Sequence, residues 1–161
     1  MKERKYRPVA EAYLTEWLGI TYPPGTWKTN VPLGDVKTYS VRVASEAEAR
    51  FIKKPFRPLA DAVVILPDEV HIIECKVRED RGKLEQLLVY EYLFPRTPEF
   101  YRYKDYPIRK ILLTPKPMGS FEEFLKKYDI EVVYYRPAWI EEYLNSLARK
   151  ERRGYSASVE F

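Results

Sequence analysis

The sequence predicts an α/β fold in which a mixed central sheet is flanked by helices. Three observations predict it: apolar residues recur at helical spacing in several segments, β-branched runs stand between those segments, and turn residues separate the two kinds. The chain has 161 residues, of which 45% are hydrophobic and 32% are charged. This length and composition indicate one globular domain over residues 1–161 and exclude a disordered chain.

The first segments predict a helix followed by a strand. Residues 8–18 carry an apolar stripe at helical spacing, and Gly19 is expected to end that helix. Pro23-Pro24-Gly25 predicts a rigid turn. Beyond it, residues 36–43 alternate as a half-buried strand does, and residues 45–48 have the capping-box pattern that opens a short helix.

The central segments predict a hairpin and then a helix. Two β-branched runs, residues 61–66 and 70–77, are separated by Pro67-Asp68-Glu69, which indicates antiparallel pairing. Residues 80–94 follow with apolar residues at helical spacing, and Pro95 is expected to stop this helix.

The remaining segments extend the sheet. Residues 98–107 are aromatic and predicted to be irregular; after them a strand is expected at 110–114, a helix at 120–128, a strand at 130–135 and a helix at 138–152. The order is therefore helix, three strands, helix and strand, with an added C-terminal helix, strand and helix. Such an order indicates a mixed sheet with helices on both faces.

Several classes of protein are excluded by composition. The charged N-terminus and the lack of any run of about 18 apolar residues predict an intracellular, cytoplasmic protein with no membrane partner. A lone Cys75 cannot form an intrachain disulfide or a cysteine-based metal cluster. The chain has one histidine, His71, which falls in a predicted strand, and this argues against Ser–His or Cys–His catalysis. His71 is interpreted as a structural residue. Amide residues are scarce, which is typical of proteins from thermophiles.

Basic residues cluster although the formal net charge is only +4. Such clusters suit a polyanionic partner, and solvated surface charge is the alternative reading. The residues expected to bind nucleic acid are Lys53, Lys54, Arg57, Arg78, Arg81 and Lys83. The aromatic residues of 98–107, interleaved with Arg102 and Lys104, would either stack on bases or pack within the protein.

Two carboxylates and a lysine carry the candidate chemistry. Alternate strand residues share a face, so Glu74 and Lys76 point the same way. Asp61 opens the preceding strand, at the end far from the turn. It shares the face of Glu74 if the hairpin loop has an even number of residues, so two or four are expected; a three-residue loop would place it on the other face.

This trio suits phosphodiester hydrolysis assisted by a metal ion. Asp61, Glu74 and the backbone carbonyl of Cys75 would supply the oxygen ligands that Mg²⁺ or Mn²⁺ prefers. Lys76 would position the attacking water or offset charge developing on the phosphate. The alternative interpretation is an ion pair between Glu74 and Lys76 on a half-exposed strand.

Asp61, twelve intervening residues and then Glu74-Cys75-Lys76 resemble the signature of the PD-(D/E)XK nuclease superfamily. The resemblance implies a restriction-endonuclease-like core over about 8–114, a C-terminal extension over about 115–153 and a tail at 154–161 without assigned function. One departure is that Pro58 lies three residues before Asp61, where the family name implies a proline immediately before it.

The helix after the signature is similar to that of RecB-like nuclease domains, which carry a Gln-X-X-X-Tyr pair. Gln86 and Tyr90 match this pair and lie one turn apart, so they would line the site; a core aromatic is the alternative for Tyr90. The cysteines that hold an iron–sulfur cluster in some relatives are absent. Many family members also use a glutamate of the first helix, for which Glu11 is favoured over Glu16, with solvated side chains as the alternative.

The resemblance and the residues together predict a metal-dependent DNA nuclease. RNA as a substrate and a homodimer are left open. The alternatives are a nucleic-acid-binding module without turnover and a viral or regulatory interaction protein on the same scaffold. Intact Asp61, Glu74 and Lys76 favour the enzyme over both.

Overall fold

The computed structural model describes residues 6–35, 57–78 and 85–157. The elements in these ranges are α1 (Tyr6–Thr21), β1 (Trp27–Pro32), β2 (Leu59–Ile65), β3 (Val70–Cys75), α4 (Gln86–Leu93), the 3₁₀ helices η3 (Phe94–Arg96) and η4 (Pro98–Tyr103), β4 (Ile108–Thr114), α5 (Phe121–Lys126), β5 (Ile130–Tyr134) and α6 (Ala138–Ala157). None of the helices in these ranges is long and apolar enough to cross a lipid bilayer.

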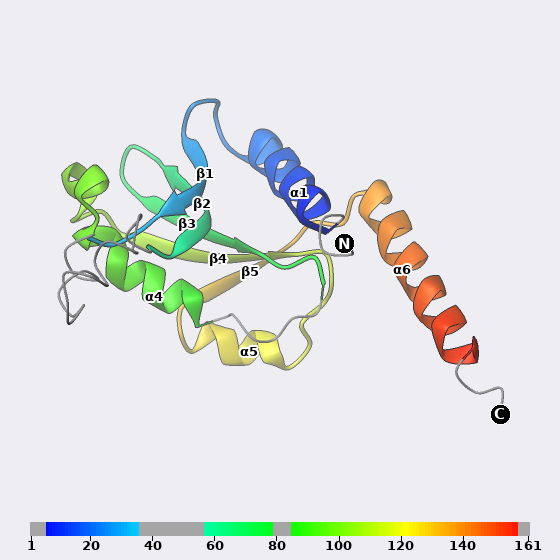
Figure 1. The fold of residues 1–161 in the computed structure, drawn as a ribbon. Coiled ribbons are helices and arrows are strands. Elements are labelled where there is room, and N and C mark those ends of the chain that lie inside the picture. Colours follow the sequence, from blue (N-terminus) through cyan, green and yellow to red (C-terminus); the bar gives the residue numbers. More distant parts are fainter. Residues whose placement is uncertain (1–5, 36–56, 79–84, 158–161) are drawn as a thin grey trace, which may run out of the picture.

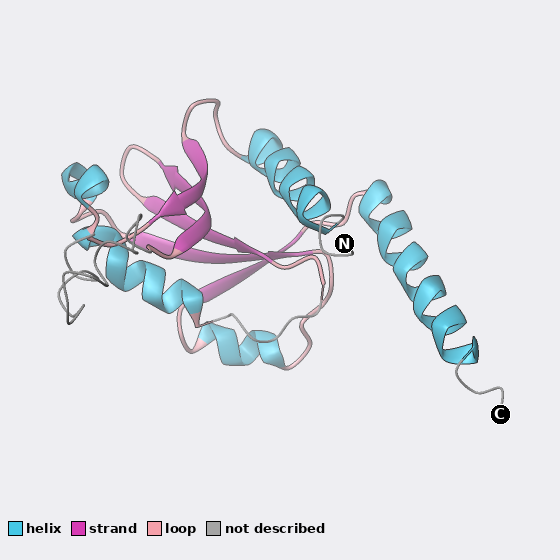
Figure 2. Ribbon diagram, viewed as in Figure 1, coloured by secondary structure: helices cyan, strands magenta, loops and turns pink. Residues whose placement is uncertain are grey.

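One mixed sheet organises these elements in the order β1-β2-β3-β4-β5 (Figures 1 and 2). The first three strands pair antiparallel, whereas β3 with β4 and β4 with β5 pair parallel. A parallel pair needs a crossover, and here α4 and α5 lie in the two connections. The predicted α/β class, with its helix, three strands, helix and strand and its added C-terminal helix–strand–helix, is confirmed.

Helices cover both faces of the sheet because the central strands are apolar on both sides. On one face Leu87 and Leu93 of α4 pack with Ile72 of β3. On the other face the apolar stripe of α1 packs with Ile73, and Ile140 of α6 joins the same cluster. Even-numbered residues of β3 therefore point toward α4 and odd-numbered residues toward α1 and α6.

The first helix and the first strand differ from those predicted from the sequence. The helix does not end at Gly19: it continues to Thr21, because Leu18 is buried and the two prolines that follow Tyr22 are stronger helix terminators than one glycine. The first strand described is Trp27–Pro32, whose three consecutive exposed residues hide the alternation expected of a strand at the sheet edge. The strand expected at 36–43 and the helix opening at 45–48 lie outside the described residues.

The β2–β3 hairpin has the even parity that the sequence analysis required. Ile65 pairs with Val70, so four residues lie between the paired positions, and the Leu66 N–H donates to the Glu69 carbonyl over 2.9 Å. The three-residue loop is therefore excluded. Continued by one residue, the same register would set Asp61 opposite Glu74.

Other boundaries shift by a few residues. Residues 98–107, expected to be irregular, contain the 3₁₀ helix η4. The α-helix after β3 ends at Leu93, one residue before the predicted end, because Pro95 converts the next turn to 3₁₀ geometry. Of the helix predicted at 80–94, residues 80–84 lie outside the described part of the chain. The last helix extends to Ala157, beyond the predicted 152.

Thr97 joins β1 to α4 at the point where the two 3₁₀ helices meet. Its side chain is fully buried, its hydroxyl donates to the Leu93 carbonyl over 2.9 Å, and its oxygen accepts from the Gly34 N–H over 2.8 Å. The short segment after β1 is thereby held against the end of α4.

We expect Thr97→Val to lower the free energy of unfolding by about 1–3 kcal/mol, because valine keeps the volume but leaves the buried Gly34 N–H without an acceptor. Urea unfolding monitored by circular dichroism measures this. Thr15→Val is the matched control, since the Thr15 hydroxyl bonds the Glu11 carbonyl on the exposed side of α1. Equal effects of the two substitutions would contradict the role assigned to Thr97.

Candidate active site

Two carboxylates lie on the adjacent strands β2 and β3, Asp61 near the start of β2 and Glu74 near the carboxyl end of β3. Glu74 is buried, with its side chain 6% exposed, whereas Asp61 is half-buried. The Asp61 Oδ2 atom accepts a hydrogen bond from the Cys75 backbone N–H over 2.8 Å. This bond ties the carboxylate of β2 to the backbone directly after Glu74.

Lys76 follows β3 immediately and lies on the side of Glu74. Its Nζ atom is 3.7 Å from Glu74 Oε1, and its side chain is 13% exposed. The backbone N–H of Lys76 donates to the Leu113 carbonyl over 2.8 Å, which continues the parallel pairing with β4 by one residue. The sheet thus keeps Lys76 in register with Glu74 beyond the last residue of the strand.

The charges of both carboxylates act on the same neighbours. Burial raises the pKa of the Tyr90 hydroxyl, and the negative charges of Glu74 and Asp61 raise it further. Burial also raises the pKa of the Cys75 thiol well above its ordinary value, with Asp61 and Glu74 adding to the rise and Lys76 opposing it. Cys75 therefore stays a thiol at neutral pH and is a poor nucleophile.

Tyr90 links the carboxylates to α4. It is buried in the hydrophobic core, and its hydroxyl donates to the Leu59 carbonyl at the start of β2 over 2.8 Å. Tyr90 is thus a core aromatic that also lies beside the carboxylates, so the two interpretations of this residue are compatible. Gln86 is half-buried at the first position of α4, one turn before Tyr90 and on the same helical face.

The structure does not bring Glu11 or Glu16 to the carboxylates. Both lie on α1, which packs on the sheet face opposite to Tyr90. Glu11 is exposed there, and Glu16 accepts hydrogen bonds from Tyr135 Oη and from Trp139 Nε1. Geometry therefore gives Glu11 no support as a site residue, because its helix covers the other side of the sheet.

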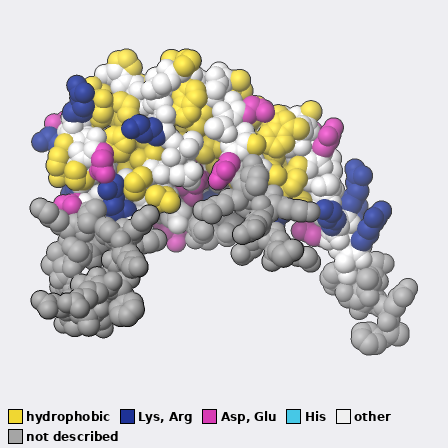
Figure 3. Space-filling view, turned by 45° about the horizontal axis from the view of Figure 1, so that its top comes forward, with side chains coloured by type: hydrophobic (Ala, Val, Ile, Leu, Met, Phe, Trp, Pro, Cys, Tyr) yellow, Lys and Arg dark blue, Asp and Glu magenta, His cyan; other side chains and the backbone are white. Residues whose placement is uncertain are grey.

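The basic residues expected to bind nucleic acid divide into three groups. Lys53, Lys54, Arg81 and Lys83 lie outside the described residues. Arg57 is engaged within the protein: its guanidinium contacts Glu99 Oε1 over 2.7 Å and the Pro32 carbonyl over 2.8 Å. Arg78 is exposed, and its Nη2 atom donates to Tyr143 Oη over 3.0 Å. Further Lys and Arg side chains gather toward the end of α6 (Figure 3).

A buried lysine was missed by the sequence analysis. Lys110 is 4% exposed on β4, and its Nζ atom lies 2.5 Å from Glu91 Oε2 of α4. This ion pair joins α4, and with it Tyr90, to strand β4. The sequence signal was a lysine followed directly by the apolar run Ile111–Leu113, where an uncompensated charge is disfavoured.

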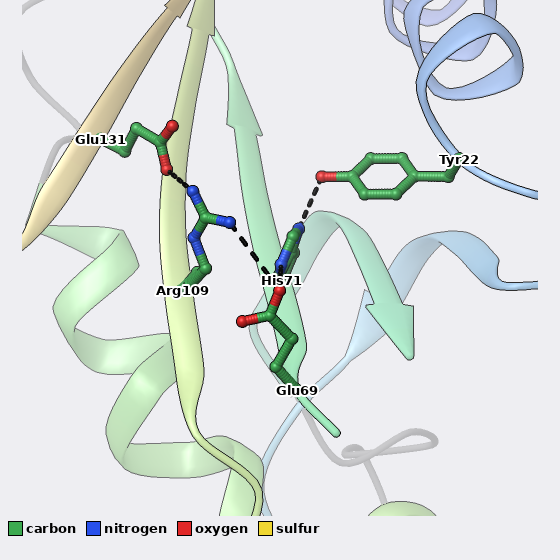
Figure 4. A network of polar contacts seen from close by, with 5 residues as sticks. All are labelled: Tyr22, Glu69, His71, Arg109 and Glu131. Atoms are coloured by element: carbon green, nitrogen blue, oxygen red, sulfur yellow. Dashed lines mark hydrogen bonds and ion pairs between the residues drawn. The ribbon is translucent and has the colours of Figure 1, made fainter. Parts of the chain in front are cut away.

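His71 lies in a polar network on the α1 side of the sheet (Figure 4). Its Nδ1 atom is 2.7 Å from Tyr22 Oη, and its Nε2 atom is 2.8 Å from Glu69 Oε1. Arg109 lies 3.8 Å from the same Glu69 oxygen and also pairs with Glu131. The network joins the hairpin loop to three strands and to the segment after α1, as a structural histidine does.

The donor set at the carboxylates fits a hard divalent cation. Asp61 and Glu74 offer carboxylate oxygens, and the Cys75 carbonyl follows Glu74 directly in the chain. Among the described residues no group of three or more His, Cys, Asp and Glu side chains could hold a metal ion. Such a pair suits Mg²⁺ or Mn²⁺, which is bound through one or two carboxylates and keeps several waters, and does not suit zinc.

No family model and no curated protein sequence matches the chain. Two similar solved structures are the protein VC1899 from Vibrio cholerae and a repair endonuclease from Pyrococcus abyssi. The first has a TM-score of 0.44 and 14% sequence identity, and the match covers 88% of this chain and 32% of that protein's chain. The second has a TM-score of 0.39 and 21% sequence identity, and the match covers 60% of this chain and 49% of that protein's chain. The chain spans less than half the length of either protein, and likenesses at this level do not identify a function.

The Glu69–His71 contact generates a prediction about acid stability. The hydrogen bond from His71 is the largest cause that lowers the pKa of Glu69 below its ordinary 4.5. A carboxyl with a lowered pKa in the folded state stabilises the fold above its ordinary pKa, and that stabilisation is lost as pH falls through the lowered value.

We therefore expect Glu69→Gln to be less stable than wild type at pH 6, with the difference shrinking as pH falls below about 4.5. Thermal unfolding between pH 6 and pH 3 measures it. Glu142→Gln, at an exposed position of α6, is the control and should follow wild type throughout. A constant gap between Glu69→Gln and wild type across this range would show that the contact is not linked to ionisation of Glu69.

Proposed function

We propose that this protein is a divalent-metal-dependent DNA nuclease whose active site contains Asp61, Glu74 and Lys76. One observation carries the proposal: two carboxylates from paired strands converge beside Tyr90, with an ammonium group 3.7 Å from Glu74. Like charges near one another in a partly buried place are costly unless a cation compensates them. Two carboxylates that hold a metal ion, together with an ammonium group, can hydrolyse a phosphodiester.

Each residue has a distinct role in the proposed reaction. Asp61 and Glu74, with the Cys75 carbonyl, would hold Mg²⁺ or Mn²⁺, which polarises a phosphate and lowers the pKa of a water when bound. The Cys75 N–H orients the Asp61 carboxylate through its Oδ2 atom, so the two strands keep a fixed relation. Because the donor is a backbone N–H, the Asp61 carboxylate is already oriented before substrate binds.

Lys76 supplies the positive charge of the site. Without substrate it lies beside Glu74; with a phosphate present its ammonium would stabilise the negative charge that develops in the transition state. Tyr90 would keep its proton at neutral pH and hold α4 against β2 through the Leu59 carbonyl. Gln86, one turn away on the same face of α4, would contact the substrate or the attacking water.

DNA is the proposed substrate because of charge. The chain has a net charge of +4 and an isoelectric point of about 9.0, and Arg78 lies on the surface two residues after Lys76. Phosphate contacts from Lys and Arg provide most of the non-specific affinity for DNA. RNA carries the same backbone charge and belongs in the same assay.

A second candidate is a nucleic-acid-binding module without turnover. The 3.7 Å separation of Lys76 and Glu74 favours it, because that is also the geometry of an ion pair in a site that holds no metal. The two candidates differ in their response to Mg²⁺, which would stabilise a protein that binds it only when folded.

Asp61→Asn, Glu74→Gln and Lys76→Met should each reduce cleavage at least about 100-fold, because each removes a charge from the reacting centre. Asparagine retains an acceptor for the Cys75 N–H, so loss of activity there is not loss of the hydrogen bond. The measurement is cleavage of labelled duplex, branched and single-stranded DNA, and of RNA, with Mg²⁺ or Mn²⁺. Glu142→Gln is the control, and equal cleavage by wild type and Glu74→Gln would exclude this site.

Mg²⁺ should raise the thermal midpoint of wild type but not that of Glu74→Gln. In the absence of metal Glu74→Gln should be as stable as wild type or more so, because it relieves repulsion from Asp61. Lys76→Met should be slightly less stable, because it removes the cation beside buried Glu74. An equal Mg²⁺ response in wild type and Glu74→Gln would place metal binding elsewhere; no response in wild type together with no cleavage would favour the binding module.

A further inference from the structure

The second half of α6 projects from the body of the molecule (Figure 1). Ile140 and Leu144 pack into the core beside α1, whereas residues 148–154 are all exposed. At about 1.5 Å of rise per residue, the helix extends roughly 14 Å from Leu144 to Arg153. The fold supplies this segment with no apolar surface, so packing does not explain its composition.

Charge is sorted around this part of the helix. With successive residues about 100° apart, Arg149, Lys150, Arg152 and Arg153 fall within an arc of about 160°, and Glu151 lies on the opposite side. We call these four residues the basic arm. Figure 3 shows Lys and Arg side chains at this end of the molecule. The arm carries a single-sign face that is exposed to solvent.

This composition determines which partner fits. Residues 149–154 contain no apolar side chain, so the arm cannot dock into a hydrophobic groove. Four positive charges on one face also repel the same face of a second copy. A polyanion with regularly spaced charges complements the arm, and the phosphate backbone of a nucleic acid has that form.

The arm is connected to the candidate active site through the sheet. Strands β3, β4 and β5 are parallel, so their carboxyl ends lie at one edge of the sheet. Glu74 and Lys76 lie at that edge of β3, and α6 begins after the same edge of β5. Arg78 spans the two parts, because its Nη2 atom donates to Tyr143 Oη of α6 over 3.0 Å.

We propose that the basic arm binds the phosphate backbone of a nucleic acid held at the Asp61–Glu74 site, on the flank of the bond to be cut. At about 3.4 Å per nucleotide along a duplex strand, its length matches roughly four phosphates. The arm contributes affinity and no chemistry, so its removal weakens binding without changing the reacting groups. This inference deepens the proposed nuclease function and relies on it for the identity of the ligand.

The test compares two variants from which the same amount of charge is removed. The arm variant is R149Q/K150Q/R152Q/R153Q; the control is K28Q/R96Q/K126Q/K127Q, at exposed positions of β1, η3 and the end of α5. Glutamine preserves helix propensity, and circular dichroism confirms the fold. Binding to a labelled duplex of 25 base pairs is followed by fluorescence anisotropy in EDTA, so that no cleavage occurs.

We expect the arm variant to bind at least tenfold more weakly at 100 mM salt. Its plot of log Kd against log salt should be shallower by about 0.9 for each phosphate that the arm no longer neutralises, hence by about 2 to 4. The control should change less than threefold. With Mg²⁺ and low salt the arm variant should show a raised KM and an unchanged kcat.

The remaining outcomes separate this inference from the nuclease proposal. Two results would overturn the proposed role of the arm alone: equally weakened DNA binding in both variants, or unchanged DNA binding in the arm variant. An arm variant that no longer dimerises but keeps its DNA affinity would overturn it as well. Binding of the arm to anionic vesicles and not to DNA would also overturn it. If wild type binds DNA through the arm but cleaves no substrate with any metal ion, the nuclease proposal fails and the proposed role of the arm in binding remains. If wild type binds no nucleic acid, both proposals are wrong.

Discussion

The pairing register of β2 with β3 is the constraint on which the candidate site depends. Side chains of a strand alternate between faces, so a shift of one residue would move Asp61 to the side of α1 and leave Glu74 among apolar residues of α4. The four-residue connection between Ile65 and Val70 fixes that register, and the apolar residues of both strands maintain it. The positions of the Asp61 and Glu74 side chains therefore follow from the packing of the sheet.

Burial of Glu74 has an energetic cost that its neighbours reduce. A carboxylate 6% exposed loses most of its hydration, and a second carboxylate opposite adds repulsion. Lys76 offsets part of the cost of burying Glu74, and the Cys75 N–H stabilises the charge of Asp61, so both compensating groups lie next to Glu74 in the chain. A divalent cation would remove the repulsion altogether, which is the physical basis for the proposed metal dependence.

Placement of α4 follows from two contacts between polar groups inside an apolar layer. Lys110 pairs with Glu91, and the Tyr90 hydroxyl donates to the Leu59 carbonyl, so the helix is joined both to β4 and to β2. Apolar packing alone would permit small rotations of the helix, whereas these directional contacts do not. They hold Tyr90 beside the carboxylates and define how close α4 stands to the site.

The sequence by itself determined the α/β class and the shared face of Glu74 and Lys76, because strand periodicity is a local signal. The even parity of the hairpin was only a condition for the site, and the pairing of Ile65 with Val70 decided it. The sequence did not locate β1, whose exposed residues lack alternation, nor the buried Lys110–Glu91 pair, whose partners come from different elements. Only the tertiary structure placed Glu11 and Tyr90 on opposite faces and engaged Arg57 with Glu99. These outcomes depend on which element covers which side of the sheet, and spacing along one chain does not encode that choice.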